Sequence, residues 1–194
     1  SNVNYDNEFS NTSFSSGIYY KFLDNILRFT YSGSYRAPHF SELFSNGVHH
    51  GTNRFEVGNE NLRIEYADQF ELKYHWANEH FGFVINPFLQ NISDFISIVP
   101  ADTFIDAYRV YNYKQYNNVE IKGLEMNLHY HPHQLHNLHI EQSYTFLQTK
   151  NKDDQYGLAL VPANSIKTKL LFDLNDYERL VNYKFDYLSF YHVY

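Results

Sequence analysis

The stretch that decides the fold spans residues 69–76 and reads QFELKYHW. Its apolar positions are Phe70, Leu72, Tyr74 and Trp76, and its polar positions are Gln69, Glu71, Lys73 and His75. Successive side chains of a β-strand point to opposite faces of a sheet. Strict alternation therefore predicts a strand that has one apolar face and carries all of its charges on the other.

The same alternation recurs along the chain in segments of about ten residues, which is the length that a tilted membrane strand requires. We predict about eight antiparallel strands, near residues 13–22, 27–35, 69–76, 81–85, 124–130, 138–146, 166–174 and 181–187. The expected fold class is all-β.

Composition supports strands and excludes a helical membrane protein. Aromatic residues make up 19% of the chain, with 19 Tyr and 17 Phe, and this bias favours β-structure. No run approaches the roughly 18 consecutive apolar residues that a membrane-spanning helix needs. A membrane β-barrel is not excluded, because only every second residue of its strands faces lipid.

Several classes of function are disfavoured. The absence of cysteine removes disulfides, thiolate metal sites and cysteine nucleophiles. The formal charge of −7 and the lack of a Lys/Arg cluster argue against a nucleic-acid partner. The sequence contains no nucleophile elbow, phosphate-binding glycine loop or zincin motif. We expect no enzyme, no catalytic residue and no cofactor.

The links between the expected strands are alternately short and long. They span residues 23–25, 36–66, 77–80, 99–110, 131–137, 149–163 and 175–178. Outer-membrane barrels have short periplasmic turns and longer extracellular loops, so this series favours a transmembrane barrel. A soluble carbohydrate-binding β-sandwich and a general porin are the alternatives, since both also contain alternating strands.

The order of links also fixes the direction of each strand. The first strand runs from outside to inside and the last runs outward, whereas complete bacterial barrels begin and end in the periplasm. We therefore expect residues 1–194 to be an interior fragment of a larger barrel, such as one with 22 strands and a plugged lumen.

Three motifs surround the long link at residues 36–66. An aromatic-Arg-Ala-Pro motif consists of Tyr35, Arg36, Ala37 and Pro38; a Glu-Leu-Phe segment begins with Glu42 and Leu43; and a third motif consists of Gly58, Asn59, Leu62 and Glu65. Their order resembles that in the barrel of TonB-dependent outer-membrane receptors. The sequence departs from the family pattern at Glu60, where a proline is usual.

The resemblance implies a location in the bacterial outer membrane and uptake of a metal or metal complex, such as haem, a siderophore or zinc. Import would be energised through the TonB complex, acting on a plug domain that is missing from this chain, as are the terminal strands. The implied partners are outer-membrane lipid, TonB and a small ligand. The charges expected to line the lumen are Glu71, Lys73, Glu125, Glu141, Lys167, Lys169 and Lys184.

Candidate ligand contacts lie in the long extracellular loop. They are His39, His49, His50, Arg54 and Glu56, of which His49 and His50 are candidate metal ligands because neutral imidazole binds Zn, Fe, Cu and Ni. The charges Arg36, Glu42, Arg54 and Glu56 are alternatively a salt-bridged framework, because buried charges need partners. A dense histidine run at residues 129–139 is expected at the opposite, periplasmic end, as a polar turn.

Overall fold

The computed structural model describes residues 9–135, 137–153, 158, 161–172 and 188–193. Its elements are β1 (Phe14–Phe22), β2 (Asn25–Arg36), α1 (Phe40–Phe44), β3 (Asn46–His49), β4 (Arg54–Val57), β5 (Glu65–Ala77), β6 (Phe81–Ile105), β7 (Tyr108–Tyr130), β8 (Leu138–Asn151), β9 (Ser165–Phe172) and β10 (Leu188–Val193). No helix in this described part of the chain is both long and apolar enough to cross a membrane.

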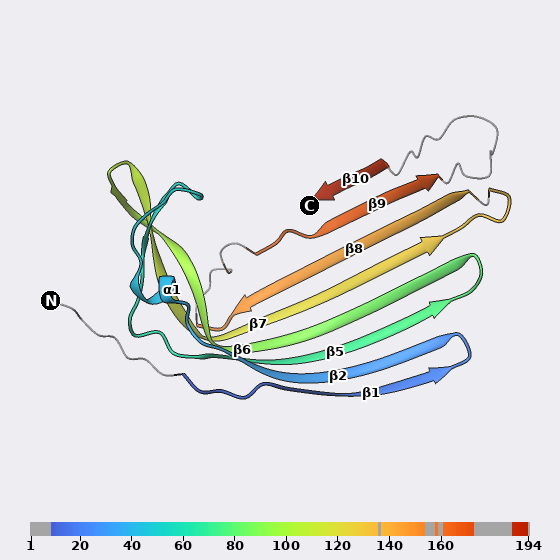
Figure 1. Ribbon diagram of the computed structural model, residues 1–194, viewed down its shortest axis with the longest axis horizontal. Helices are drawn as coiled ribbons and strands as arrows, with labels where there is room; N and C mark the ends of the chain where they lie inside the picture. The colour runs from blue at the N-terminus through green and yellow to red at the C-terminus, as the bar shows by residue number, and fades with distance from the viewer. Residues whose placement is uncertain (1–8, 136, 154–157, 159–160, 173–187, 194) are drawn as a thin grey trace.

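The main strands form one antiparallel sheet in the order β1-β2-β5-β6-β7-β8-β9-β10, and β3 and β4 lie off this path (Figure 1). Each strand of the path pairs with the next one along the chain, apart from the β3–β4 excursion between β2 and β5. Within the described residues the sheet is open, because β1 and β10 are its two ends. This arrangement confirms the predicted all-β fold and fits part of a larger barrel.

The pairing register confirms that the alternating sequence makes an apolar face. Leu72 lies opposite Phe29, and Phe70 lies opposite Tyr31, with ring centroids 4.9 Å apart. Ile18, in the same row as Phe29, is 73% exposed. Rows of large apolar side chains left open to the surroundings are rare on soluble proteins but normal on a face that meets lipid.

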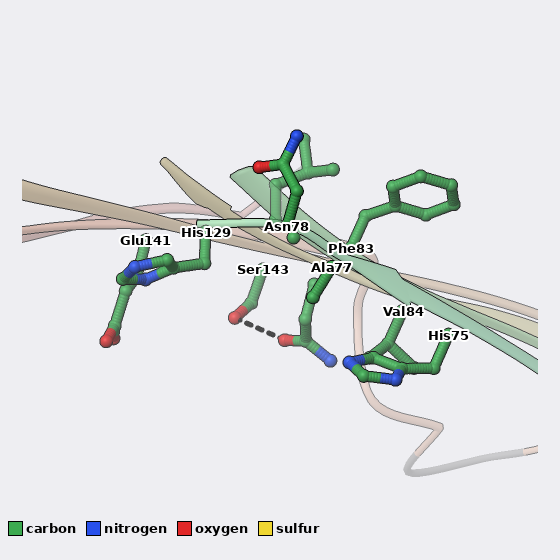
Figure 2. A pocket seen from close by; sticks show the side chains of 11 residues that line it. His75, Ala77, Asn78, Phe83, Val84, His129, Glu141 and Ser143 are labelled. Carbon is green, nitrogen blue, oxygen red and sulfur yellow. Dashed lines mark hydrogen bonds between the residues drawn. The ribbon is translucent and has the colours of Figure 1, made fainter. Parts of the chain in front are cut away.

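The other face is polar. Glu141 forms an ion pair with Lys169 at 3.2 Å, and the Ser143 hydroxyl donates a hydrogen bond of 2.7 Å to Asn127 Oδ1. Figure 2 shows His75, His129, Glu141 and Ser143 on one side of the sheet and Phe83 on the other. These four polar side chains line a pocket together with smaller and apolar residues, among them Ala77, Gly82 and Val84. Of the charges expected in the lumen, Lys184 lies outside the described residues.

The turns have the predicted polarity. The β1–β2, β5–β6 and β7–β8 turns lie at one end of the sheet, whereas the long β2–β5 loop and the tip of the β6–β7 hairpin lie at the other (Figure 1). The β1–β2 turn consists of only Leu23 and Asp24. By the rule for outer-membrane barrels, the end with the short turns is periplasmic.

One predicted link is wrong. The sequence predicts a long loop over residues 99–110. Instead β6 and β7 continue to a two-residue turn at Asp106 and Ala107, both with positive φ, as the favoured hairpin turns require. Pro87, Pro100 and a register shift between Pro100 and Phe104 interrupt the alternation along β6, which hides the length of the strand in the sequence.

The C-terminal part of the prediction can be compared only in part. The strand expected at residues 181–187 and the turn expected at 175–178 lie outside the described residues. The described segment β10 pairs antiparallel with β9, with Leu188 opposite Leu170. The meander of neighbouring strands thus continues to the last described element.

Candidate functional site

The long loop between β2 and β5 folds onto the extended β6–β7 hairpin. The β3–β4 hairpin forms within this loop, and β4 pairs in parallel with β7, with Phe55 opposite Val110 and Val57 opposite Asn112. The neighbour of β7 on this side, β8, ends opposite Val119, so β4 takes the edge that β8 leaves free. A four-stranded extension β6-β7-β4-β3 therefore stands at the extracellular end of the sheet.

A helical turn and a small apolar cluster support this extension. Leu43 of α1, Leu62 and Ile96 of β6 are each buried and form the cluster, with Phe44 and Tyr113 packed against it. The helix was not predicted, although the sequence carries its signal. His39 caps the helix through its Nδ1, which accepts a hydrogen bond from the Ser41 N–H, while the Glu42 side chain accepts one from the His39 N–H.

Gly58 and Asn59 hold the helix from the other side. The Gly58 N–H donates to the Ser45 carbonyl at 2.7 Å, and the Asn59 N–H donates to the Glu42 carbonyl at 2.8 Å. A Cβ at position 58 would lie 2.5 Å from the Leu43 carbonyl oxygen, so a side chain does not fit there without a backbone shift. The Gly-Asn motif therefore serves close backbone packing as well as the turn.

Arg36 connects the end of β2 to the loop. Its guanidinium contacts the Glu65 carboxylate and forms an ion pair with Glu42 at 2.9 Å. Glu65 also accepts the N–H of Ile96, which lies on β6 beyond the end of the β5 pairing at Ser93. The Glu65 carboxylate thus accepts hydrogen bonds from the Arg36 guanidinium and from the Ile96 N–H, which has no β5 partner.

Arg54 and Glu56 face each other and the β6–β7 hairpin. Glu56 is 5% exposed; Arg54 Nε donates to it at 2.7 Å, and the Tyr113 hydroxyl donates to it at 3.0 Å. The Arg54 guanidinium also lies 5.1 Å from the ring centre of Tyr111. Burial and the contact with Glu56 raise the pKa of Tyr113 to about 12. These four side chains join the two hairpins as a salt-bridged framework.

A second polar contact crosses the same region and was missed in the sequence. Arg63 forms an ion pair with Asp94, and the Gln115 side chain bonds to the N–H and the carbonyl of Arg63. Gln115 also donates to the Asp94 carbonyl at 2.7 Å. Asp94 and Gln115 are 31 and 52 positions from Arg63, so no local sequence pattern indicates these contacts.

Among the candidate histidines, His49 lies opposite Arg54 in the β3–β4 pairing. His49 and His50 are exposed at the β3–β4 turn, and His49 Nδ1 lies 3.0 Å from the Thr52 hydroxyl oxygen. His39, although exposed, is already used as a helix cap. Among the described residues, no three His, Cys, Asp or Glu side chains converge into a metal site. The exposed imidazoles of the loop other than the helix cap His39 are thus His49 and His50 at its tip.

Comparison with protein families identifies one family for this chain. The sequence matches the family described as "TonB dependent receptor-like, beta-barrel" over residues 1–193. A comparison with curated proteins finds no match.

Solved structures give the same fold. The copper transporter OprC superimposes with a TM-score of 0.68 at 16% identity, covering 83% of this chain and 24% of that one. A mutant of the ferric enterobactin receptor PfeA from Pseudomonas aeruginosa, in complex with enterobactin, gives 0.63 at 18%, covering 84% and 26%. The Serratia marcescens hemophore receptor HasR, in complex with its hemophore and heme, gives 0.57 at 15%, covering 84% and 30%.

The chain spans about a quarter of the length of these structures. The family match and the single antiparallel sheet favour a receptor barrel over the β-sandwich and the general porin. Members of this family are transporters rather than enzymes and are located in the bacterial outer membrane. The chain belongs to the β-barrel family of TonB-dependent receptors.

Proposed function

We propose that this chain is part of the barrel of a receptor that takes up a metal or metal complex across the outer membrane, energised through TonB. The observation that carries the proposal is the family match over residues 1–193. The similar structures point the same way, because they are named for copper, ferric enterobactin and hemophore. Haem, a ferric siderophore and a bare metal ion are the candidate cargoes.

The ligand-facing part is proposed to be the β3–β4 turn with His49 and His50. Both side chains are exposed at the extracellular end, and the turn is held by a framework whose charges are already paired with each other. Arg54 and Glu56 would then position the turn rather than contact the ligand, since Glu56 is buried beneath Arg54 and Tyr113. A rigid base with an accessible tip suits selective binding.

Binding of haem, a ferric siderophore and Zn²⁺ to the full-length receptor in detergent tests the proposal. The double variant H49A/H50A is expected to weaken binding of the preferred ligand at least about tenfold, because ligation by imidazole is lost. Barrel assembly should be unchanged, since both positions are exposed. Equal binding by wild type and variant would remove the two histidines from the site.

Dependence on TonB is tested in cells. Uptake of the ligand identified in vitro should require both this receptor and a functional TonB complex. Uptake that continues at the same rate without TonB would contradict energised import and favour passive diffusion.

A further inference from the structure

Five described histidines gather at the periplasmic end of the sheet. His80 lies in the β5–β6 turn, His129 lies near the end of β7, His131 and His133 follow that strand, and His139 lies at the start of β8. The sequence alone suggests a run within one polar turn. The fold adds His80 to it from 53 residues away.

The rings are in contact with one another. His131 stacks on His139 with ring centroids 4.8 Å apart and an interplanar angle of 10°. His80 lies 4.9 Å from His133 and 5.7 Å from His131, centroid to centroid. The His131 N–H donates to the His80 carbonyl at 2.7 Å, which ties the β5–β6 turn to the end of β7. The position of His80 is therefore fixed by backbone as well as by ring packing.

The closest approach is between two ring nitrogens. His80 Nε2 and His133 Nδ1 are 3.2 Å apart. Two metal–nitrogen bonds of about 2.0–2.1 Å at a tetrahedral angle separate their nitrogens by about 3.3 Å. The distance between the two nitrogens thus matches the spacing of two imidazole ligands on one metal ion. His133 is exposed, so an ion and its water ligands can reach the pair from solvent.

We propose that His80 and His133 form a two-histidine site for a divalent late transition metal at the periplasmic mouth of the barrel. Imidazole nitrogen is a good ligand for such ions. Cu²⁺ is expected to bind more tightly than Zn²⁺, as it does at most protein sites that bind divalent first-row metals. Solvent can supply further ligands to the ion, because His133 is exposed. Among the described residues no three His, Cys, Asp or Glu side chains converge on one point.

This site is separate from the ligand-facing loop. His49 and His50 lie at the β3–β4 turn, at the opposite end of the strands from the β5–β6 and β7–β8 turns (Figure 1). The inference therefore does not depend on the identity of the cargo. It predicts metal binding even if the loop binds none.

The test uses the full-length receptor in detergent, stripped with EDTA and carrying H49A/H50A so that the loop turn cannot contribute. Cu²⁺ and Zn²⁺ are titrated against a chromogenic chelator. Adding H80A or H133A should weaken Cu²⁺ binding at least about tenfold, because each removes one of two ligands. The variant H133Q should weaken Cu²⁺ binding as much as H133A does. Its amide can keep a hydrogen bond to His80 but does not supply an imidazole nitrogen.

The variant H139A is the matched control, because it removes a ring from the same cluster and leaves both proposed ligands in place. Its Cu²⁺ affinity should stay within about threefold of the parent. Electron paramagnetic resonance of the Cu²⁺-loaded parent should show coupling to two imidazole nitrogens, and H133Q should lose one. Absence of Cu²⁺ binding in the parent, or binding by H133Q equal to the parent, would overturn the site and leave only a hydrogen bond between the rings.

Discussion

The two ends of this sheet are held together by different chemistry. At the extracellular end, carboxylates are buried and paired: Glu56 with Arg54 and Tyr113, and Glu65 with Arg36 and the backbone of β6. At the periplasmic end, histidine rings stack and approach one another across two short turns. The first arrangement supports a long loop, whereas the second joins turns that are already short.

The difference follows from what each end has to do. A long loop has few strand partners, so its backbone and charges need specific contacts to adopt one conformation. A short turn is already set by the strands on either side, which leaves its side chains available for other interactions. A single substitution should therefore reduce stability more in the extracellular framework than in the histidine cluster.

The largest effect is expected for Glu56→Ala. Removing the carboxylate leaves Arg54 and the Tyr113 hydroxyl without their shared partner, and breaking a buried pair of this kind costs about 3 kcal/mol. Hydrogen exchange on the full-length receptor should show faster opening of β3, β4 and the outer part of β6–β7. The matched control is Glu141→Ala, whose ion pair with Lys169 is partly exposed and should cost less than about 1 kcal/mol. Equal effects would contradict the comparison.

A smaller effect is expected for Tyr113→Phe, which removes one hydrogen bond to Glu56 at a cost of about 1 kcal/mol. The same residue provides a pH test. Its pKa is raised from 10.0 to about 12, so its contribution to stability is complete below pH 10 and is lost as the pH rises toward 12. The difference in tyrosinate absorbance between wild type and variant should therefore titrate near pH 12. A midpoint near 10 would contradict both the burial of this hydroxyl and its hydrogen bond to Glu56.

The smallest effect is expected for His131→Ala in the histidine cluster. This change removes the ring stacked on His139 but keeps the backbone N–H that bonds to His80. Because the ring is half-exposed, its loss should cost about 0.5 kcal/mol, at the low end for an aromatic contact. Hydrogen exchange should quicken only in the β5–β6 and β7–β8 turns. A loss as large as that for Glu56→Ala would mean that the cluster, rather than the framework, is the more important structural support.

Sequence patterns predict the parts of this molecule that depend on neighbouring residues. Alternation gives the strands and their faces, as at residues 69–76, because the period of a strand is local. It does not show that β6 and β7 extend to Asp106, since proline interrupts the pattern along β6. The α1 cap at His39 and Glu42 is a local signal that was missed because histidine is not a usual capping residue.

The contacts that complete each cluster are not local. Tyr113 lies 57 residues from Glu56, Gln115 lies 52 from Arg63, and His133 lies 53 from His80. Such partners are set by strand pairing, because the register decides which residues of distant segments become neighbours. The candidate residues Arg54 and Glu56 were therefore found in the sequence, but their pairing with Tyr113 and Tyr111 required the fold.

The central claim is that this sheet is a wall of a membrane barrel, with one face toward lipid and the other toward a polar lumen. Residues 1–194 contain no cysteine. Single cysteines can therefore be introduced into this segment and spin-labelled in the full-length receptor in lipid, after any cysteine elsewhere in the receptor is replaced by serine. Labels at Phe70, Leu72 and Tyr74 should be relaxed strongly by oxygen, which concentrates in lipid. Labels at Glu71 and Lys73 should not, and this alternation is the predicted result. Equal relaxation at all five positions, or a period of three to four residues, would contradict the account.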